Sequence, residues 1–161
     1  MLREGDRAPD VTLTGPDGRP VRLLELAGDR ILVVYFYPKD DTPVCTTQAC
    51  GFRERHDEFL AAGAVVIGIS ADPPASHARF AAKNELPFPL LSDESGEARR
   101  AFGVKPFLGL LAGRVTFVVD RAGVIRLAHA AQLRARSHVD RALEVVRAIA
   151  AGAGTEADAD R

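Results

Sequence analysis

The sequence predicts an α/β fold in which a mixed central sheet carries helices on both faces, and three observations lead to this class. The segments "RILVVYFYP" and "AVVIGIS" are near-continuous apolar runs, a pattern typical of strands buried on both faces. The stretch between them carries Phe52, Phe59 and Leu60 at helical intervals among charged residues. Later, "VTFVVDRAGVIRLAH" indicates a hairpin that turns at Asp120 to Gly123. A parallel pair joined by a helix and followed by an antiparallel hairpin requires a mixed sheet.

The elements can be assigned in chain order. The opening holds strand-like pieces at 11–14 and 20–23 around "GPDG", whose residues favour a turn, so we expect an N-terminal β-hairpin. The first long helix is expected from about Thr46 to Ala62, with Gly63 as its C-terminal glycine. The next segments predict a helix that begins at proline, a short strand and a short helix: "PPASHARFAAKNEL", "FPLLSD" and "SGEARRAFG".

The C-terminal part of the chain predicts one more helix and a tail. Ser137 is suited to an N-cap, and apolar residues recur on one helical face as far as Ala150. We therefore expect one domain over residues 1–152 and a disordered tail over residues 153–161. The order of elements fits a thioredoxin-like architecture, although a fold alone does not supply a function.

Composition excludes several classes of protein. Lys and Arg total 21 against 22 Asp and Glu, and the charges are interspersed, so nothing resembles a nucleic-acid binding surface. No apolar run reaches the roughly 18 to 20 residues that span a membrane. The start, "MLREGDRAPD", lacks an apolar signal segment, so a cytoplasmic location is expected. In that compartment a cysteine pair is more often redox-active or metal-binding than structural.

Both cysteines of the chain lie in the stretch "YFYPKDDTPVCTTQAC". Cys45 follows a buried strand through a loop bounded by Pro38 and Pro43, and it stands at the start of the next helix. Unpaired amides and the helix dipole favour an anion there, so Cys45 is the candidate reactive thiolate. Thr42 could present its hydroxyl to the same sulfur.

The spacing of Cys45 and Cys50 can be tested against helix geometry. Five positions apart on a helix, two Cα atoms are about 8.7 Å distant and their side chains point roughly 140° apart, which is beyond the reach of a disulfide. Two outcomes stay open. Either the thiols never pair, or they pair only when the first turns of the helix unwind after Cys45 has been oxidised to a sulfenic acid.

At this point the chain resembles a known family, the peroxiredoxins, and within it the bacterioferritin comigratory protein or peroxiredoxin Q group. The stretch "FYPKDDTPVCTTQACGFRE" is similar to that group's active site, with Pro38, Thr42, Cys45 and Cys50 at the matching positions. The resemblance continues through "GDRAPDVTLTGPDGRPVRL", "AVVIGISAD", "FPLLSDESGEARRAFGV" and "RVTFVVDRAGVIR", and only the tail falls outside it.

The resemblance implies a thiol peroxidase that reduces hydrogen peroxide and organic hydroperoxides. It implies that Cys45 attacks the peroxide, that Thr42 and Arg114 orient the two oxygens, and that Cys50 closes an intramolecular disulfide. It further implies recycling by thioredoxin or a similar dithiol, no cofactor, and a monomer or weak homodimer. The four histidines match no zinc pattern with the cysteines, so no metal site is expected: His56, His77, His129 and His138.

Two departures and two alternatives accompany this interpretation. Val44 stands where many members carry Gly, and the segment "KPFLGLLAG", residues 105–113, differs from the family's usual polar loop. Its Leu108, Leu110 and Leu111 could line an apolar pocket mouth or contact a partner. The alternative functions are a thioredoxin-like disulfide oxidoreductase, which requires thiols about 5 Å apart, and a non-enzymatic redox sensor or holdase.

Overall fold

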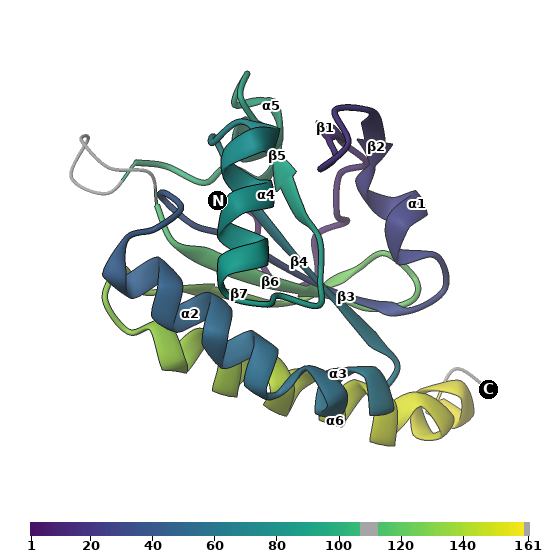
Figure 1. The fold of residues 1–161 in the computed structure, drawn as a ribbon. Helices are drawn as coiled ribbons and strands as arrows, with labels where there is room; N and C mark the ends of the chain where they lie inside the picture. Colours follow the sequence, from purple (N-terminus) through teal and green to yellow (C-terminus); the bar gives the residue numbers. More distant parts are fainter. Residues whose placement is uncertain (107–112, 160–161) are drawn as a thin grey trace.

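The computed structural model describes residues 1–106 and 113–159, with side chains as far as residue 152 (Figure 1). The strands are β1 Thr12–Thr14, β2 Pro20–Arg22, β3 Ile31–Phe36, β4 Ala64–Ser70, β5 Leu90–Ser92, β6 Val115–Val119 and β7 Ile125–Ala130. The helices are α1 Leu23–Ala27, α2 Pro43–Glu54, α3 His56–Ala61, α4 Pro74–Lys83, α5 Glu97–Phe102 and α6 Ala135–Ala159.

The described strands form one mixed sheet in the order β2-β1-β5-β4-β3-β6-β7. Strands β3, β4 and β5 run parallel, because the connections between them are crossovers that include helices. The hairpin β6–β7 joins the free side of β3 in antiparallel register, with Val34 opposite Phe117. Strand β3 is therefore an interior strand between β4 and β6, and every one of its residues is buried.

Alternation along the central strands divides the core into two layers. Ile31, Val33 and Tyr35 of β3 face the side covered by α2, α3, α4 and α6, where Phe52 and Phe80 pack. Leu32, Val34 and Phe36 face the side covered by α1, α5 and the N-terminal segment. Figure 1 shows α2 and α6 lying side by side on one face of the sheet. Cys45 belongs to the first layer.

Most of the predicted elements are confirmed. The mixed sheet with helices on both faces is observed, the N-terminal hairpin pairs Leu13 with Val21, and the strand at residues 64–70 has the predicted bounds. Gly63 has a φ of +82°, the left-handed conformation expected of a glycine at the end of a helix.

The first two helical segments differ from the prediction. The helix expected at 46–62 begins at Pro43 and is divided at Arg55, whose ψ of 7° leaves the helical range. Proline fits this earlier start because the first helical position needs no amide donor. The segment after β2 forms the short helix α1, which was not predicted; the amide of Leu24 at its start donates to Asp10.

The last helix is also longer than predicted. It begins at Ala135 rather than Ser137, whose hydroxyl donates to the carbonyl of Arg134, and it extends to Ala159. The disordered tail expected over residues 153–161 stays a prediction, because its side chains and residues 160–161 lie outside the described residues. Leu108, Leu110 and Leu111 also lie outside the described residues.

Candidate active site

Cys45 is the third residue of α2 and is 1% exposed. The first hydrogen bond of the helix runs from the amide of Thr46 to the carbonyl of Thr42. The amides of Val44 and Cys45 therefore precede the helical ladder, and together with the helix dipole they favour negative charge at this position. The sequence placed Cys45 at a helix start, and the structure confirms that placement.

Arg114 brings a positive charge to the sulfur from the other side. It immediately precedes β6, and its Nη2 lies 3.2 Å from the Sγ of Cys45, where it donates a hydrogen bond. The side chain is only 3% exposed, and its remaining donors are directed to Gln48 Oε1 and to the carbonyl of Gln132, the latter at 2.8 Å. A buried guanidinium with fixed partners has little conformational freedom, so its positive charge stays next to the Cys45 sulfur.

Cys50 lies in the same uninterrupted helix but not in the same site. Its Sγ is half-buried and donates to the side-chain oxygen of Asn84, the residue that ends α4, at 3.7 Å. Both cysteines are free thiols. The intact helix therefore keeps the two sulfurs apart, as its geometry predicts for residues five positions apart.

Thr42 and Pro38 border the loop that leads into α2. Thr42 is the N-cap residue, and its hydroxyl donates to the carbonyl of Lys39 at 2.8 Å rather than to Cys45. Pro38 is half-buried, two positions after the last residue of β3. Of the sequence-predicted residues, the structure brings together Cys45 and Arg114, places Thr42 and Pro38 on the preceding loop, and leaves Cys50 beside α4.

The same loop contains a buried acid that the sequence analysis did not single out. Asp40 is 5% exposed and lies 2.7 Å from the Nδ1 of His77 and 2.6 Å from the hydroxyl of Tyr37. Burial by itself raises the pKa of Asp40, but the hydrogen bonds from His77, Tyr37 and Ser76 outweigh it and hold the pKa below its usual value. Asp40 is therefore a buried carboxylate.

Gln48 and Gln132 were also missed. Gln132 accepts from the Arg114 side chain through its main-chain carbonyl, and its side-chain oxygen accepts from the Arg114 amide at 3.1 Å. Gln48 lies one turn after Cys45 on α2, which is a signal that could have identified it. Nothing local marks Gln132, since it follows Arg114 by 18 positions and meets it only through the β6–β7 hairpin.

A family model for the AhpC/TSA family matches residues 4–128, most of the chain. The chain belongs to the AhpC/TSA family. Among curated relatives of this AhpC/TSA protein, "Peroxiredoxin Q, chloroplastic" from Sedum lineare is 45% identical over 149 residues, 92% of this chain and 80% of the relative. The expected peroxiredoxin Q resemblance is thus confirmed.

Solved structures agree with the fold. The AhpC/TSA chain is 38% identical to peroxidoxin BcpB from Mycobacterium tuberculosis, with a TM-score of 0.86 over 92% of this chain and 99% of that one. It is 34% identical to the bacterioferritin comigratory protein of Xanthomonas campestris, with a TM-score of 0.78 over 87% of this chain and 92% of that one. The latter structure is described as giving insight into that protein's alkyl peroxide reduction activity. The thioredoxin-like fold and the enzyme class, a thiol-dependent peroxidase, are confirmed.

The remaining expectations concern the cellular location and membrane-spanning segments. The expected cytoplasmic location is contradicted, because the curated relatives reported from Sedum lineare and from Arabidopsis thaliana are named as chloroplastic proteins. In the described part of the chain, no helix combines the length and the apolar character that crossing a membrane requires.

Proposed function

We propose that this AhpC/TSA protein reduces hydrogen peroxide and organic hydroperoxides through Cys45, with Cys50 as the resolving thiol. The observation that carries the proposal is the hydrogen bond from Arg114 to the Cys45 sulfur at the start of α2. A guanidinium and free helix amides around one buried sulfur stabilise the thiolate, which is the nucleophilic form of cysteine.

In the first step the Cys45 thiolate attacks one oxygen of the hydroperoxide. The O–O bond breaks, a sulfenic acid forms on Cys45, and the departing hydroxide or alkoxide takes a proton from solvent. The hydroxyl of Thr42 donates its hydrogen bond to the Lys39 carbonyl, so its oxygen remains able to accept a hydrogen bond from the substrate O–H. Arg114 then orients the oxygens and stabilises the developing negative charge.

In the second step Cys50 attacks the oxidised sulfur, so that an S–S bond forms and water leaves. Because both cysteines belong to α2, the turn between Thr42 and Thr46 must open before the sulfurs can meet. A dithiol protein of the thioredoxin class then reduces the disulfide and becomes a disulfide itself, which returns both thiols. The resolving role of Cys50 and this reductant come from the resemblance. No cofactor is required, and we retain the expectation of a monomer or weak homodimer.

The substrate range follows from the surface beside Cys45. A pocket of about 370 Å³ opens against the first turn of α2, with Pro43, Val44 and Thr47 on one side and residues 133–136 on the other. Leu133 is 78% exposed there, the most exposed large apolar side chain in the described part of the chain. The lining is mixed, because Arg134 and Arg136 stand beside the apolar Pro43, Val44 and Leu133. Its apolar part lies next in sequence to the reactive cysteine and can contact a hydrocarbon group, so we include organic hydroperoxides.

The test is stopped-flow mixing of the reduced protein with stoichiometric cumene hydroperoxide, followed by intact mass. The parent protein should lose two hydrogens, whereas Cys50→Ser should gain one oxygen and react with a sulfenic-acid probe. Cys45→Ser should do neither. Consumption of peroxide by Cys45→Ser at the parent rate contradicts the assignment, and a slow, incomplete reaction of the parent would favour a redox sensor over an enzyme.

A further inference from the structure

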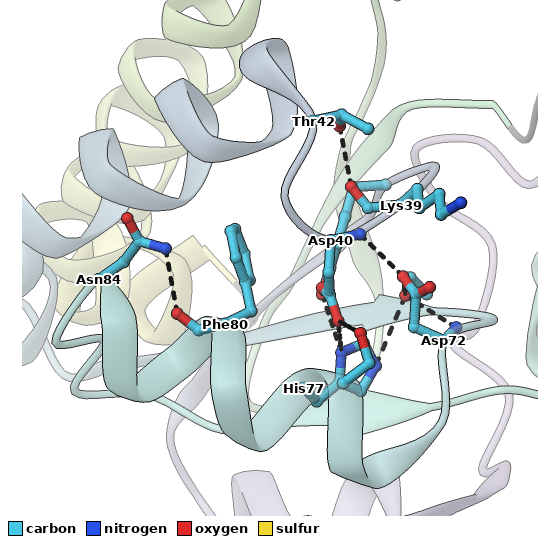
Figure 2. A network of polar contacts seen from close by, with 10 residues as sticks. Lys39, Asp40, Thr42, Asp72, His77, Phe80 and Asn84 are labelled. Carbon is cyan, nitrogen blue, oxygen red and sulfur yellow. Dashed lines mark hydrogen bonds and ion pairs between the residues drawn. The ribbon is translucent and has the colours of Figure 1, made fainter.

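A buried network joins the loop before Cys45 to helix α4 (Figure 2). The carboxylate of Asp40 receives three hydrogen bonds: from the Nδ1 of His77, from the Tyr37 hydroxyl, and from the Ser76 hydroxyl at 2.8 Å. His77 and Ser76 belong to α4, and His77 is 1% exposed. A histidine from another element therefore contacts the loop carboxylate through Nδ1, while its Nε2 lies 3.5 Å from the Ser70 hydroxyl.

The main chain of Asp40 is fixed as well. Its amide donates to the Oδ2 of Asp72 at 2.8 Å, and the same oxygen accepts from the Ser70 hydroxyl at 2.8 Å. The next residue, Asp41, has a φ of +60°, the left-handed region that residues other than glycine adopt only at some cost. The loop therefore depends on its anchors to keep this turn.

The position of this anchor matters for Cys45. Asp40 precedes the N-cap residue Thr42 by two positions, and the first turn of α2 buries little besides Cys45, since Pro43 is exposed and Val44 half-buried. The sulfur lies 3.2 Å from the guanidinium of Arg114. A displacement of about 1 Å at this end of the helix weakens that hydrogen bond and misaligns the sulfur with the peroxide oxygen that it attacks. Such a misplacement can lower the rate of the reaction by up to about a hundredfold.

We propose that His77 is a positioning residue for the oxidation of Cys45, because its hydrogen bond to Asp40 holds the loop that sets the start of α2. The inference rests on the proposed role of Cys45 as the nucleophile. The polar partners of His77 are Asp40, Tyr37 and Ser70 rather than Cys45, so we infer that it acts on the sulfur indirectly, through Asp40. Its removal should slow sulfenic acid formation and leave the reaction of Cys50 with a sulfenic acid already formed much less affected.

A metal site is the competing interpretation of the same cluster. Asp40, Asp72 and His77 offer ligand atoms that all lie within 4.8 Å of one another. However, the Nδ1 of His77 faces a carboxylate oxygen at 2.7 Å, so this nitrogen carries a proton, and the carboxylates already accept from hydroxyl and amide groups. Donors within the protein thus occupy the positions that a cation would take.

The experiment measures the rate of sulfenic acid formation in the Cys50→Ser background. His77→Leu removes the donor to Asp40 and should slow this step roughly tenfold or more, since a hydrogen bond to a charged group is lost. His77→Asn places an amide donor near the position of Nδ1 and should recover most of the rate. Phe59→Leu, in the buried core under α3, is the control for lost stability and should oxidise at the parent rate while folded.

The outcomes separate this inference from the proposed function. If Cys45→Ser is inactive but folded His77→Leu oxidises at the parent rate, the positioning role is wrong and the proposed function stands. If His77→Leu does not fold, Asp40→Asn takes its place, with the same slowing expected. Failure of His77→Asn to recover rate, or stoichiometric zinc in the purified parent that His77→Leu lacks, also overturns the positioning role.

Discussion

The Nη2 of Arg114 lies 3.2 Å from the Sγ of Cys45, although 69 positions separate the two residues in the chain. The contact forms because β6 pairs with β3, whose end leads through the loop into α2. Replacing Arg114 by Gln removes the buried charge and should lower the rate of Cys45 oxidation about 10- to 100-fold, the equivalent of about 1.5–3 kcal/mol. Single-turnover oxidation in the Cys50→Ser background measures it. Arg79→Gln, at an exposed position of α4, is the matched control and should not change the rate.

Gln48 holds Arg114 through its Oε1, while its Nε2 has no partner among the described side chains and backbone. Gln48→Leu leaves one guanidinium donor unpaired and should destabilise the protein by about 1–3 kcal/mol and slow oxidation. Gln48→Glu keeps the acceptor but adds an anion that competes with the thiolate for Arg114, so it should slow oxidation further while costing less stability. Urea unfolding together with single-turnover kinetics checks both; equal rates in the two variants would contradict the argument.

Burial of His138 predicts how stability depends on pH. Its Nε2 donates to the carbonyl of Ala131 and its Nδ1 accepts from the Thr116 hydroxyl, each at 2.7 Å, and burial lowers the pKa of His138 from 6.5 to about 4. Between these values the unfolded chain binds a proton on this ring that the folded protein does not, so the free energy of unfolding falls as pH drops from about 6.5 to about 4. The loss amounts to about 3 kcal/mol.

The variant His138→Gln tests this directly. It should be less stable than the parent at pH 7, because the buried hydrogen bonds change, but its free energy of unfolding should decline less between pH 7 and pH 4.5. Urea denaturation at a series of pH values gives both quantities. A decline as steep as that of the parent would show that other groups cause the acid sensitivity.

Position 68 in β4 has no room for a side chain, so it requires glycine. A Cβ at this position would lie 2.7 Å from Leu90 Cδ2 and 2.9 Å from Tyr35 Cζ, both in the packed core. Gly68→Ala should therefore destabilise the protein by about 1–3 kcal/mol, as overpacking does. Gly152→Ala in α6 meets nothing within 4 Å and should be neutral or stabilising. The midpoints of thermal unfolding of both variants, compared with that of the parent, test these two expectations.

At Tyr35, in contrast to Gly68, a substitution is expected to keep or raise the stability of the protein. Its ring stacks on Phe52 with centroids 4.7 Å apart, but its buried hydroxyl has no hydrogen-bond partner among the described residues. Tyr35→Phe keeps the stacking and removes an unsatisfied polar group, so the free energy of unfolding should stay equal or rise by up to about 1 kcal/mol. A loss above that size in urea unfolding would mean that the hydroxyl has a partner, such as a bound water.

The strands and the reactive cysteine could be predicted from the sequence because their signals are local. A few consecutive residues are enough to predict the apolar strands β3 and β4 and the proline-bounded loop before Cys45. Arg114 had no local signal and was found only through the resemblance. Gln132 and the pair Asp40–His77 were not found, because a hydrogen bond between residues far apart depends on the tertiary fold. The prediction of the cellular location was wrong for another reason, because the N-terminal residues alone do not determine the compartment of a protein.

The packing of α2 against α6 determines which thiol has to travel. A Cβ at Gly51 would lie 3.1 Å from Val139 Cγ2, so the two helices are in close contact immediately after Cys50. Only the turns before that contact are free to open, and they carry Cys45. In the disulfide that we propose, Cys50 would be the stationary partner and Cys45 the one that leaves its pocket. A thiol reductant would then meet the oxidised pair at the surface beside α4, where Cys50 contacts Asn84, and substrate and reductant would not compete for one opening.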